Sequence, residues 1–364
     1  MSEIMGKHKT IMLLVTYKCN LHCSYCYEPK LQAFRMDAKK AKGIIQEQIA
    51  KLSDEYDSVE VQFMGGEPLL EFPLIKEVSE WLWTTPINKK LMVLFAPTNG
   101  TLLTHEMKNW FTENSARIHL GLSFDGNMDM QNVNRSISYS KVDLDYFVQT
   151  WPEQSVKMTI SPETIAHLSD GVIFLHEKGF KYISADLAMG PSVNWSKDSL
   201  AIYRSELQKL SHYYLEHPTL IPFSMLRIDV AAIKSSHNVD VKTCSCGEDM
   251  ICVDWTGKTY ACHLFSPVTL PIDKVLKSSQ LYDFSNHSQF NSEICSKCIL
   301  NAICNHCYGM NYLCTGDVAK PSPFHCSAFK ILFVANCRFR LMLAKKRQDK
   351  TLQERVYKTI SRII

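Results

Sequence analysis

Residues 11–27 read IMLLVTYKCNLHCSYCY, an apolar run followed at once by three cysteines within eight residues. A short apolar run that ends in polar residues predicts a buried β-strand. Cys19, Cys23 and Cys26 then lie in the loop beyond the strand. Structural zinc takes four protein ligands, whereas an iron–sulfur cluster held by three cysteines keeps one iron open. The stretch predicts such a cluster, in preference to buried thiols or a zinc knuckle.

The composition is that of a globular protein, with 364 residues, 14 cysteines and a net charge of +3. The opening residues MSEIMGKHKT lack the long apolar region of a secretory signal. We therefore expect a cytoplasmic protein whose cysteines bind metal in a reducing compartment. No apolar run reaches the length of a membrane span, so no membrane association is expected. The small net charge gives no reason to expect nucleic acid as a partner.

The first two hundred residues alternate between short apolar runs and segments with helical spacing. The expected strands are residues 11–16, 59–64, 91–96, 118–124, 156–161 and 182–189, and the expected helices include 36–52, 72–83, 105–114 and 162–179. Six such units predict an α/β fold, an open or partial (β/α)6 barrel of the TIM type. In that architecture the loops after the strands form the active site, which is where the cysteine triplet falls.

The second half differs, because eleven of the fourteen cysteines lie from Cys244 onward. We expect three regions: a barrel over residues 1–220, a cysteine-rich domain over 221–337 and a basic C-terminal helix over 338–364. Leu352, Val356, Ile360 and Ile363 would form one apolar stripe on that helix. Docking onto the chain's own barrel is the default expectation for the stripe, and contact with a partner or peptide is the alternative.

A second motif, Met64-Gly65-Gly66-Glu67-Pro68, ends the second expected strand. With the cysteine triplet, it resembles the radical S-adenosylmethionine (SAM) enzymes. The resemblance implies a [4Fe–4S] cluster whose open iron is chelated by SAM. It also implies that one electron cleaves SAM to a 5′-deoxyadenosyl radical, which abstracts hydrogen from a substrate. A strand-to-helix turn is the ordinary explanation of a glycine pair alone.

The same resemblance implies which residues contact SAM. Glycines without a Cβ let the backbone approach a ligand, so backbone groups of Gly65 and Gly66, or Glu67, would bind the ammonium group of SAM. Residues at later strand ends would complete the site: Asn99 and Ser123 as ribose or nearby polar contacts, Arg135 for the methionine carboxylate, and Leu187 against the adenine.

The cysteine-rich half resembles the SPASM extension of radical enzymes that modify peptides and proteins. The motif comprises Cys246-x10-Gly257-x4-Cys262, then Cys295-x2-Cys298-x5-Cys304-x2-Cys307 and Cys326. The resemblance implies two auxiliary [4Fe–4S] clusters. One would be held by Cys246, Cys262 and Cys307, the other by Cys295, Cys298, Cys304 and Cys326.

Some assignments in this half stay open. Cys244 is the first choice for a fourth ligand of the nearer cluster and Cys252 the second. Two residues rather than the usual three separate Cys304 from Cys307, which puts the role of Cys307 in question. The remaining Cys314 and Cys337 are expected to be packed thiols. A structural zinc module is the alternative for the whole region, because CxxC pairs also bind zinc.

The SPASM resemblance implies oxidative modification of a ribosomally made peptide: a thioether, a carbon–carbon or carbon–oxygen crosslink, or side-chain oxidation. A sulfatase-maturing, formylglycine-generating enzyme is the alternative. His263 weakens this alternative, because sulfatase-maturing enzymes carry an acidic residue directly after the cysteine that matches Cys262. His263 would accept a proton in that role, or it would hydrogen-bond beside the cluster instead. We name no catalytic base. A non-enzymatic iron–sulfur electron carrier or zinc-stapled interaction protein is a third possibility.

The expected partners are a peptide or protein substrate and an external electron donor. The triplet begins at Cys19, so we expect no leader-binding domain before it. Recognition would then come from a separate protein or from the chain's own surface.

Overall fold

The computed structural model describes residues 7–28, 34–86, 91–233 and 242–361. Its contacts divide the chain into two compact units whose segments alternate along the sequence. The first unit consists of Met1–Phe124, Arg135–Val156 and Ser245–Ser285, and the second of Asp125–Asn134, Lys157–Cys244 and Asn286–Ile364.

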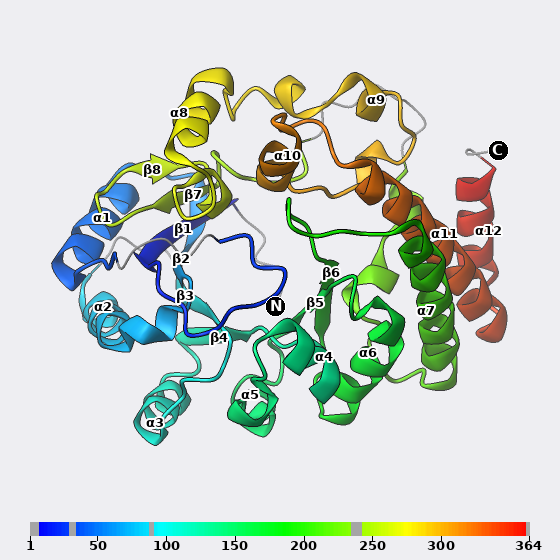
Figure 1. The fold of residues 1–364 in the computed structure, drawn as a ribbon, viewed down its shortest axis with the longest axis horizontal. Coiled ribbons are helices and arrows are strands. Elements are labelled where there is room, and N and C mark those ends of the chain that lie inside the picture. Colours follow the sequence, from blue (N-terminus) through cyan, green and yellow to red (C-terminus); the bar gives the residue numbers. More distant parts are fainter. Residues whose placement is uncertain (1–6, 29–33, 87–90, 234–241, 362–364) are drawn as a thin grey trace. The chain divides into compact units, whose positions relative to one another are not determined.

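A six-stranded sheet forms the centre of the first unit, in the order β4-β3-β2-β1-β7-β8 (Figure 1). Its strands are β1 (Lys7–Thr16), β2 (Tyr56–Gly65), β3 (Leu91–Thr98), β4 (Ile118–Leu122), β7 (Met250–Val253) and β8 (Thr259–Tyr260). Strands β1 to β4 pair in parallel, and β8 returns antiparallel to β7. Seven successive residues of β1, from Thr10 to Thr16, are buried, as expected of a strand covered on both faces.

Helices α1 (Ala38–Ala50), α2 (Phe72–Thr84) and α3 (His105–Glu113) of the first unit return the chain between its parallel strands. Helices α5 (Leu144–Thr150) and α8 (Ile272–Leu281) also belong to this unit. Helix α1 begins where the Asp37 carboxylate accepts a hydrogen bond from Lys40 N at 2.8 Å. It buries Ala41, Ile44 and Ile45, which recur at the spacing of one helical face.

The second unit is mainly helical. Strands β5 (Val156–Ile160) and β6 (Ile183–Leu187) form a separate two-stranded sheet. The helices are α4 (Met128–Asn134), α6 (Leu168–Glu177), α7 (Lys197–Glu216), α9 (Glu293–Ser296), α10 (Tyr308–Thr315), α11 (Pro323–Lys346) and α12 (Lys350–Ile360). In the part of the chain that the structure describes, no helix is both long and apolar enough to cross a membrane.

The six strands expected in the first half are all present, and β1 to β6 each cover the predicted apolar run or most of it. Two features differ from the expectation. Strand β7, from the cysteine-rich half, joins the edge of β1 in parallel register. The C-terminal segment is two helices, because Gln348 adopts a left-handed backbone with φ of 54° and Asp349 caps a new helix through Leu352 N.

The apolar stripe of the last helix is only partly described. Val356 is buried, Leu352 and Ile360 are half-buried, and Ile363 lies outside the described residues. The domain limits expected at residues 220 and 337 stay predictions.

Candidate functional site

The cysteine triplet lies in the loop directly after β1, as its position in the sequence predicts. Cys19, Cys23 and Cys26 are each half-buried. The backbone N–H of Leu21 donates to the Cys19 sulfur at 3.4 Å, and Cys26 N donates to Cys23 O at 3.1 Å. A donor directed at a sulfur favours its thiolate form, which is the form that binds iron. Three thiolates would suit an iron–sulfur cluster.

The glycine pair packs against this loop. Gly66 N donates to Thr16 O at 3.3 Å, and Glu67 N donates to Lys18 O at 2.8 Å. A Cβ on Gly65 would lie 2.3 Å from Thr16 O, and one on Gly66 would lie 2.5 Å from Lys18 O. Both positions therefore require glycine because the end of β2 crosses the cluster loop. The sequence had suggested a different reason, approach of the backbone to a ligand, which stays a prediction.

The Glu67 carboxylate is buried and accepts hydrogen bonds from three protein donors. These are Leu69 N at 3.1 Å, the Thr98 hydroxyl at 2.8 Å and Asn99 N at 2.8 Å. Burial raises the pKa of Glu67 to about 7, and the hydrogen bonds and the charge of Arg135 oppose that rise. Glu67 thus joins the ends of β2 and β3 beside the cluster loop. Its predicted contact with the ammonium group of SAM stays a prediction.

Asn99 connects the end of β3 to the triplet. Its side-chain N–H donates to the Asn20 amide oxygen at 2.9 Å, and Asn20 in turn donates to the Thr101 hydroxyl at 2.7 Å. Asn20 lies between Cys19 and Cys23 in sequence. This hydrogen-bond network therefore connects the cluster loop, which follows β1, to the end of β3. Sequence reasoning missed Asn20, although its place inside the triplet was a usable signal.

Arg135 and Ser123 also belong to the first unit. Arg135 is buried, with its guanidinium 5.6 Å from the centre of the Tyr25 ring. The backbone of Ser123 donates to Thr98 O at 2.8 Å, which ties the end of β4 to the end of β3. Leu187 ends β6 in the second unit, half-buried.

A strained turn follows Arg135. Ser136 and Ile137 both adopt positive φ, 56° and 53°, and Ile137 is 75% exposed. A β-branched residue rarely adopts this conformation, so surrounding contacts must hold the turn. One such contact reaches the cluster loop, because the Ser136 hydroxyl accepts from His22 N at 2.8 Å.

His263 lies close to the end of the triplet loop. Its Nε2 is 3.1 Å from the Tyr27 hydroxyl. Burial lowers the pKa of His263 to about 4, so the ring is neutral near pH 7. Among the residues that the structure describes, Nδ1 of this ring has no hydrogen-bond partner. His263 is thus a neutral, hydrogen-bonded ring next to Cys262 in sequence, and the role of Cys262 as a cluster ligand stays a prediction.

Three cysteines of the cysteine-rich half lie in the first unit. Cys246 and Cys262 are buried, and Cys252 lies fully buried inside β7. Burial raises the pKa of Cys252 well above its usual value, and the nearby charge of Cys262 adds to the rise. A fully buried strand thiol is the environment of a packed side chain, the alternative that the sequence allowed for Cys252.

Four cysteines of the second unit influence one another. Burial raises the pKa of Cys304 to about 12, and charges on Cys326, Cys295 and Cys298 raise it further. These four are the set that the SPASM resemblance implies for the farther cluster. His325 places its Nε2 3.7 Å from the Cys304 sulfur.

Cys244 and Cys307 also lie in the second unit. Burial raises the pKa of Cys307 to about 11; backbone donors at Met310 and Gly309 oppose the rise, while the charge of Cys244 adds to it. This proximity favours Cys244 over Cys252 as the companion ligand of Cys307. The remaining cysteines differ, since Cys314 is exposed and Cys337 is buried. No three His, Cys, Asp or Glu side chains in the described ranges converge on a site for one metal ion.

Comparison with known proteins bears on the first half most directly. Residues 5–140 match the family model described as a 4Fe-4S single cluster domain. The uncharacterized protein MJ0907 of Methanocaldococcus jannaschii is 29% identical over 186 residues, which cover 49% of this chain and 62% of that protein. The radical SAM cyclopropyl synthase TigE of Paramaledivibacter caminithermalis is 21% identical over 345 residues, covering 86% of this chain and 69% of TigE.

Solved structures share the fold over most of the chain. The structure of anSMEcpe with bound AdoMet matches with a TM-score of 0.71 and 17% identity, covering 96% of this chain and 98% of that one. Streptococcus suis SuiB bound to its precursor peptide SuiA matches with a TM-score of 0.62 and 16% identity, covering 88% of this chain and 76% of SuiB. These likenesses establish the α/β partial-barrel fold with its cysteine-rich C-terminal region.

Proposed function

The chain is a radical SAM enzyme that resembles SPASM-domain peptide maturases, and from this premise we propose that it oxidatively modifies a ribosomally synthesised peptide. The observation that carries the proposal is the braced triplet loop, in which three cysteines follow β1 and are supported by the glycine pair of β2 and by Asn99 of β3. SuiB, whose structure was solved with the precursor peptide SuiA, supports a peptide as the substrate class.

In this proposal Cys19, Cys23 and Cys26 hold a [4Fe–4S] cluster whose open iron takes the cofactor. When bound, the cluster and SAM supply one-electron cleavage and hydrogen-atom abstraction from the substrate. Glu67 acts as a positioning residue. The three hydrogen bonds that its carboxylate accepts hold the ends of β2 and β3 together. The buried Arg135 is the candidate for the methionine carboxylate.

The cysteine-rich segments hold two auxiliary clusters in the same proposal. Cys295, Cys298, Cys304 and Cys326 bind one of them, and their mutual effect on the Cys304 pKa supports the grouping. Cys244, Cys246, Cys262 and Cys307 bind the other. Bound there, the two clusters would supply an acceptor for the second electron, and an external donor would supply the first.

The test is anaerobic reconstitution with reductant and SAM. We expect release of 5′-deoxyadenosine, and we expect the product peptide, made by coexpression with a neighbouring short open reading frame, to lose two hydrogens per crosslink. Absence of 5′-deoxyadenosine from fully reconstituted protein would overturn the proposal. Alanine variants at Cys19, Cys23 and Cys26 are the matched negative control.

Sulfatase maturation is the second candidate, because the fold match to anSMEcpe extends over nearly the whole chain. His263 argues against it, since this neutral, buried ring occupies the position after Cys262. A cysteine-containing sulfatase peptide separates the two functions: conversion of its cysteine to formylglycine, seen as loss of sulfur in the mass spectrum, would favour the second candidate.

A further inference from the structure

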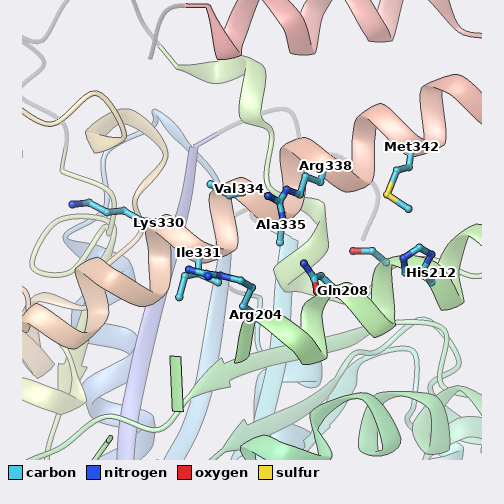
Figure 2. Close-up of a pocket in the computed structure, with 10 residues that line it drawn as sticks. Arg204, Gln208, His212, Lys330, Ile331, Val334, Ala335, Arg338 and Met342 are labelled. Atoms are coloured by element: carbon cyan, nitrogen blue, oxygen red, sulfur yellow. The ribbon is translucent and has the colours of Figure 1, made fainter. Parts of the chain in front are cut away.

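A groove runs along the second unit between helices α7 and α11 (Figure 2). It encloses about 480 Å³, and its residues come from one stripe of each helix. The walls and floor are formed by Arg204, Gln208, Ser211 and His212 of α7 and by Lys330, Ile331, Val334, Ala335, Arg338 and Met342 of α11. No function described above uses it.

Helical spacing explains the shape of the groove. Arg204, Gln208 and His212 recur every four residues on α7 and are exposed, and Lys330, Val334 and Arg338 do the same on α11. Residues four apart lie on one face of a helix, so the two stripes line the groove as opposite rims. In Figure 2, Arg204 lies beside Ile331 at one end and His212 lies toward Met342 at the other.

The floor of the groove is mainly apolar and is formed in part by small side chains. Ser211 and Ala335 are buried and small, so neither side chain fills the space between the rims. Ile331 and Met342 are half-buried beside them, and Val334 is 46% exposed. An apolar floor that water reaches gains free energy when a ligand's apolar side chains cover it.

The rims carry charge of one sign. Arg204, Lys330 and Arg338 are cations at neutral pH, and the described residues that line the groove include no carboxylate. Among the ion pairs of the described residues, none involves these three side chains. Cations without a carboxylate partner, above an apolar floor, complement a ligand with both carboxylates and apolar side chains.

The length of the groove selects an extended ligand. Lys330 and Met342 are twelve residues apart on α11, so the groove is about 18 Å long at the helical rise. An extended peptide of about five or six residues spans this length. Alternate side chains of such a peptide point to opposite faces, which would direct apolar residues to the floor and carboxylates to the rims.

A nucleic acid fits less well. Proteins that bind single strands combine many cations with aromatic platforms on which bases stack, and the described residues that line this groove include no Phe, Tyr or Trp. We therefore propose that the α7–α11 groove binds an acidic, extended segment of the peptide substrate, with Arg204, Lys330 and Arg338 pairing its carboxylates. This inference rests on the proposed function, for which it names the chemistry of the substrate segment.

The test uses the full chain and a fluorescein-labelled ten-residue peptide of alternating Glu and Leu. Fluorescence anisotropy should show saturable binding that weakens with salt, and the double variant Arg204→Glu with Arg338→Glu should bind at least tenfold more weakly. The reversed groove should instead bind the matching Lys–Leu peptide, an outcome that misfolding would not produce. Lys320→Glu, an exposed lysine of the same unit, is the matched control and should leave binding unchanged.

Equal binding of the acidic peptide by the wild type and the double variant would overturn the inference. Tighter binding of a ten-nucleotide single-stranded RNA than of the acidic peptide would overturn it as well. Release of 5′-deoxyadenosine without peptide, measured on the same samples, keeps the two proposals separate: its absence from the wild type refutes the radical reaction, whereas loss of peptide binding alone refutes the groove.

Discussion

Glu67 was expected from the sequence to lie at the site, and the structure adds contacts that the sequence did not predict. The motif Met64–Pro68 located it at the end of β2, beside the cluster loop. The structure adds that its carboxylate accepts from Leu69, Thr98 and Asn99. Those donors come from two separate strand ends, and no local sequence pattern reports which backbone N–H groups meet in space.

The raised pKa of Glu67 predicts a specific pH dependence of stability. Burial lifts the pKa from 4.5 to about 7, so the folded state holds a proton that the unfolded state has released. This contribution is fully present below pH 4.5 and is lost as pH rises through about 7, a change of about 3 kcal/mol. The unfolding free energy of the wild type minus that of Glu67→Gln, from urea denaturation at pH 5 to 8, should therefore fall as pH rises.

Glu106→Gln, at an exposed position of α3, is the control and should track the wild type at every pH. Parallel profiles for the wild type and Glu67→Gln would contradict the burial of an ionisable carboxyl at this position.

His325 predicts a change in reduction potential. Its Nε2 lies 3.7 Å from the Cys304 sulfur, and hydrogen bonds to cluster sulfurs raise the potential because they stabilise the more negative, reduced cluster. His325→Phe should lower the midpoint potential of one auxiliary cluster in a redox titration followed by electron paramagnetic resonance. His167→Gln, an exposed histidine bonded to Asp170, should not. An unchanged potential in His325→Phe would show that the ring does not donate to the ligand.

At the scale of elements, the sequence predicted what depends on local pattern. The six strands were visible because their apolar residues are contiguous or alternate with polar ones, and helices α1 to α3 were visible because their apolar residues recur at helical spacing. Strand β7 pairs with β1, and this pairing could not be predicted. The strand has four residues, and Thr10 of β1 pairs with Met250, from a distant part of the chain.

The break between α11 and α12 was missed for a different reason. Polar and basic residues continue through Lys345–Lys350 without a proline or glycine, so composition gives no stop signal. The break depends on one left-handed residue, Gln348, followed by the Asp349 cap. Left-handed backbone at glutamine is uncommon, which is why a sequence pattern does not anticipate it.

The crossing of β2 over the cluster loop predicts the effect of a single methyl group. In Gly66→Ala the new Cβ would lie 2.5 Å from Lys18 O and 2.9 Å from the Cys19 Cβ, so the loop must shift. We expect a loss of about 1–3 kcal/mol in unfolding free energy, together with reduced iron loading of the triplet, measured by iron analysis after reconstitution.

Gly43→Ala in α1 is the matched control, because nothing lies within 4 Å of its added Cβ. It should stabilise the protein by about 0.5–1 kcal/mol, the usual gain from replacing glycine inside a helix. Equal effects of the two substitutions would show that the glycine pair does not position the loop.

At the scale of the whole molecule, the cysteines fall into sets that differ in surroundings as well as sequence. The triplet lies in a loop, and Cys252 lies inside a strand. Three other cysteines of the second unit lie close enough to Cys304 to raise its pKa. The SPASM resemblance implied the auxiliary sets, and Cys244 was placed ahead of Cys252. The charge of Cys244 raises the pKa of Cys307, and the order of the two candidates stays a prediction.

The cysteine sets therefore predict the iron content of the reconstituted protein and of its cysteine variants. Reconstituted wild type should hold about twelve irons, the number in three [4Fe–4S] clusters, and alanine at all three triplet positions should leave about eight, because the auxiliary ligands come from other segments. Cys244→Ala should lower the iron content of the auxiliary clusters, whereas Cys252→Ala should leave it unchanged, since Cys252 is a packed strand thiol. The opposite result, iron lost with Cys252→Ala and retained with Cys244→Ala, would exchange the two assignments. Zinc in place of iron throughout would refute the auxiliary clusters.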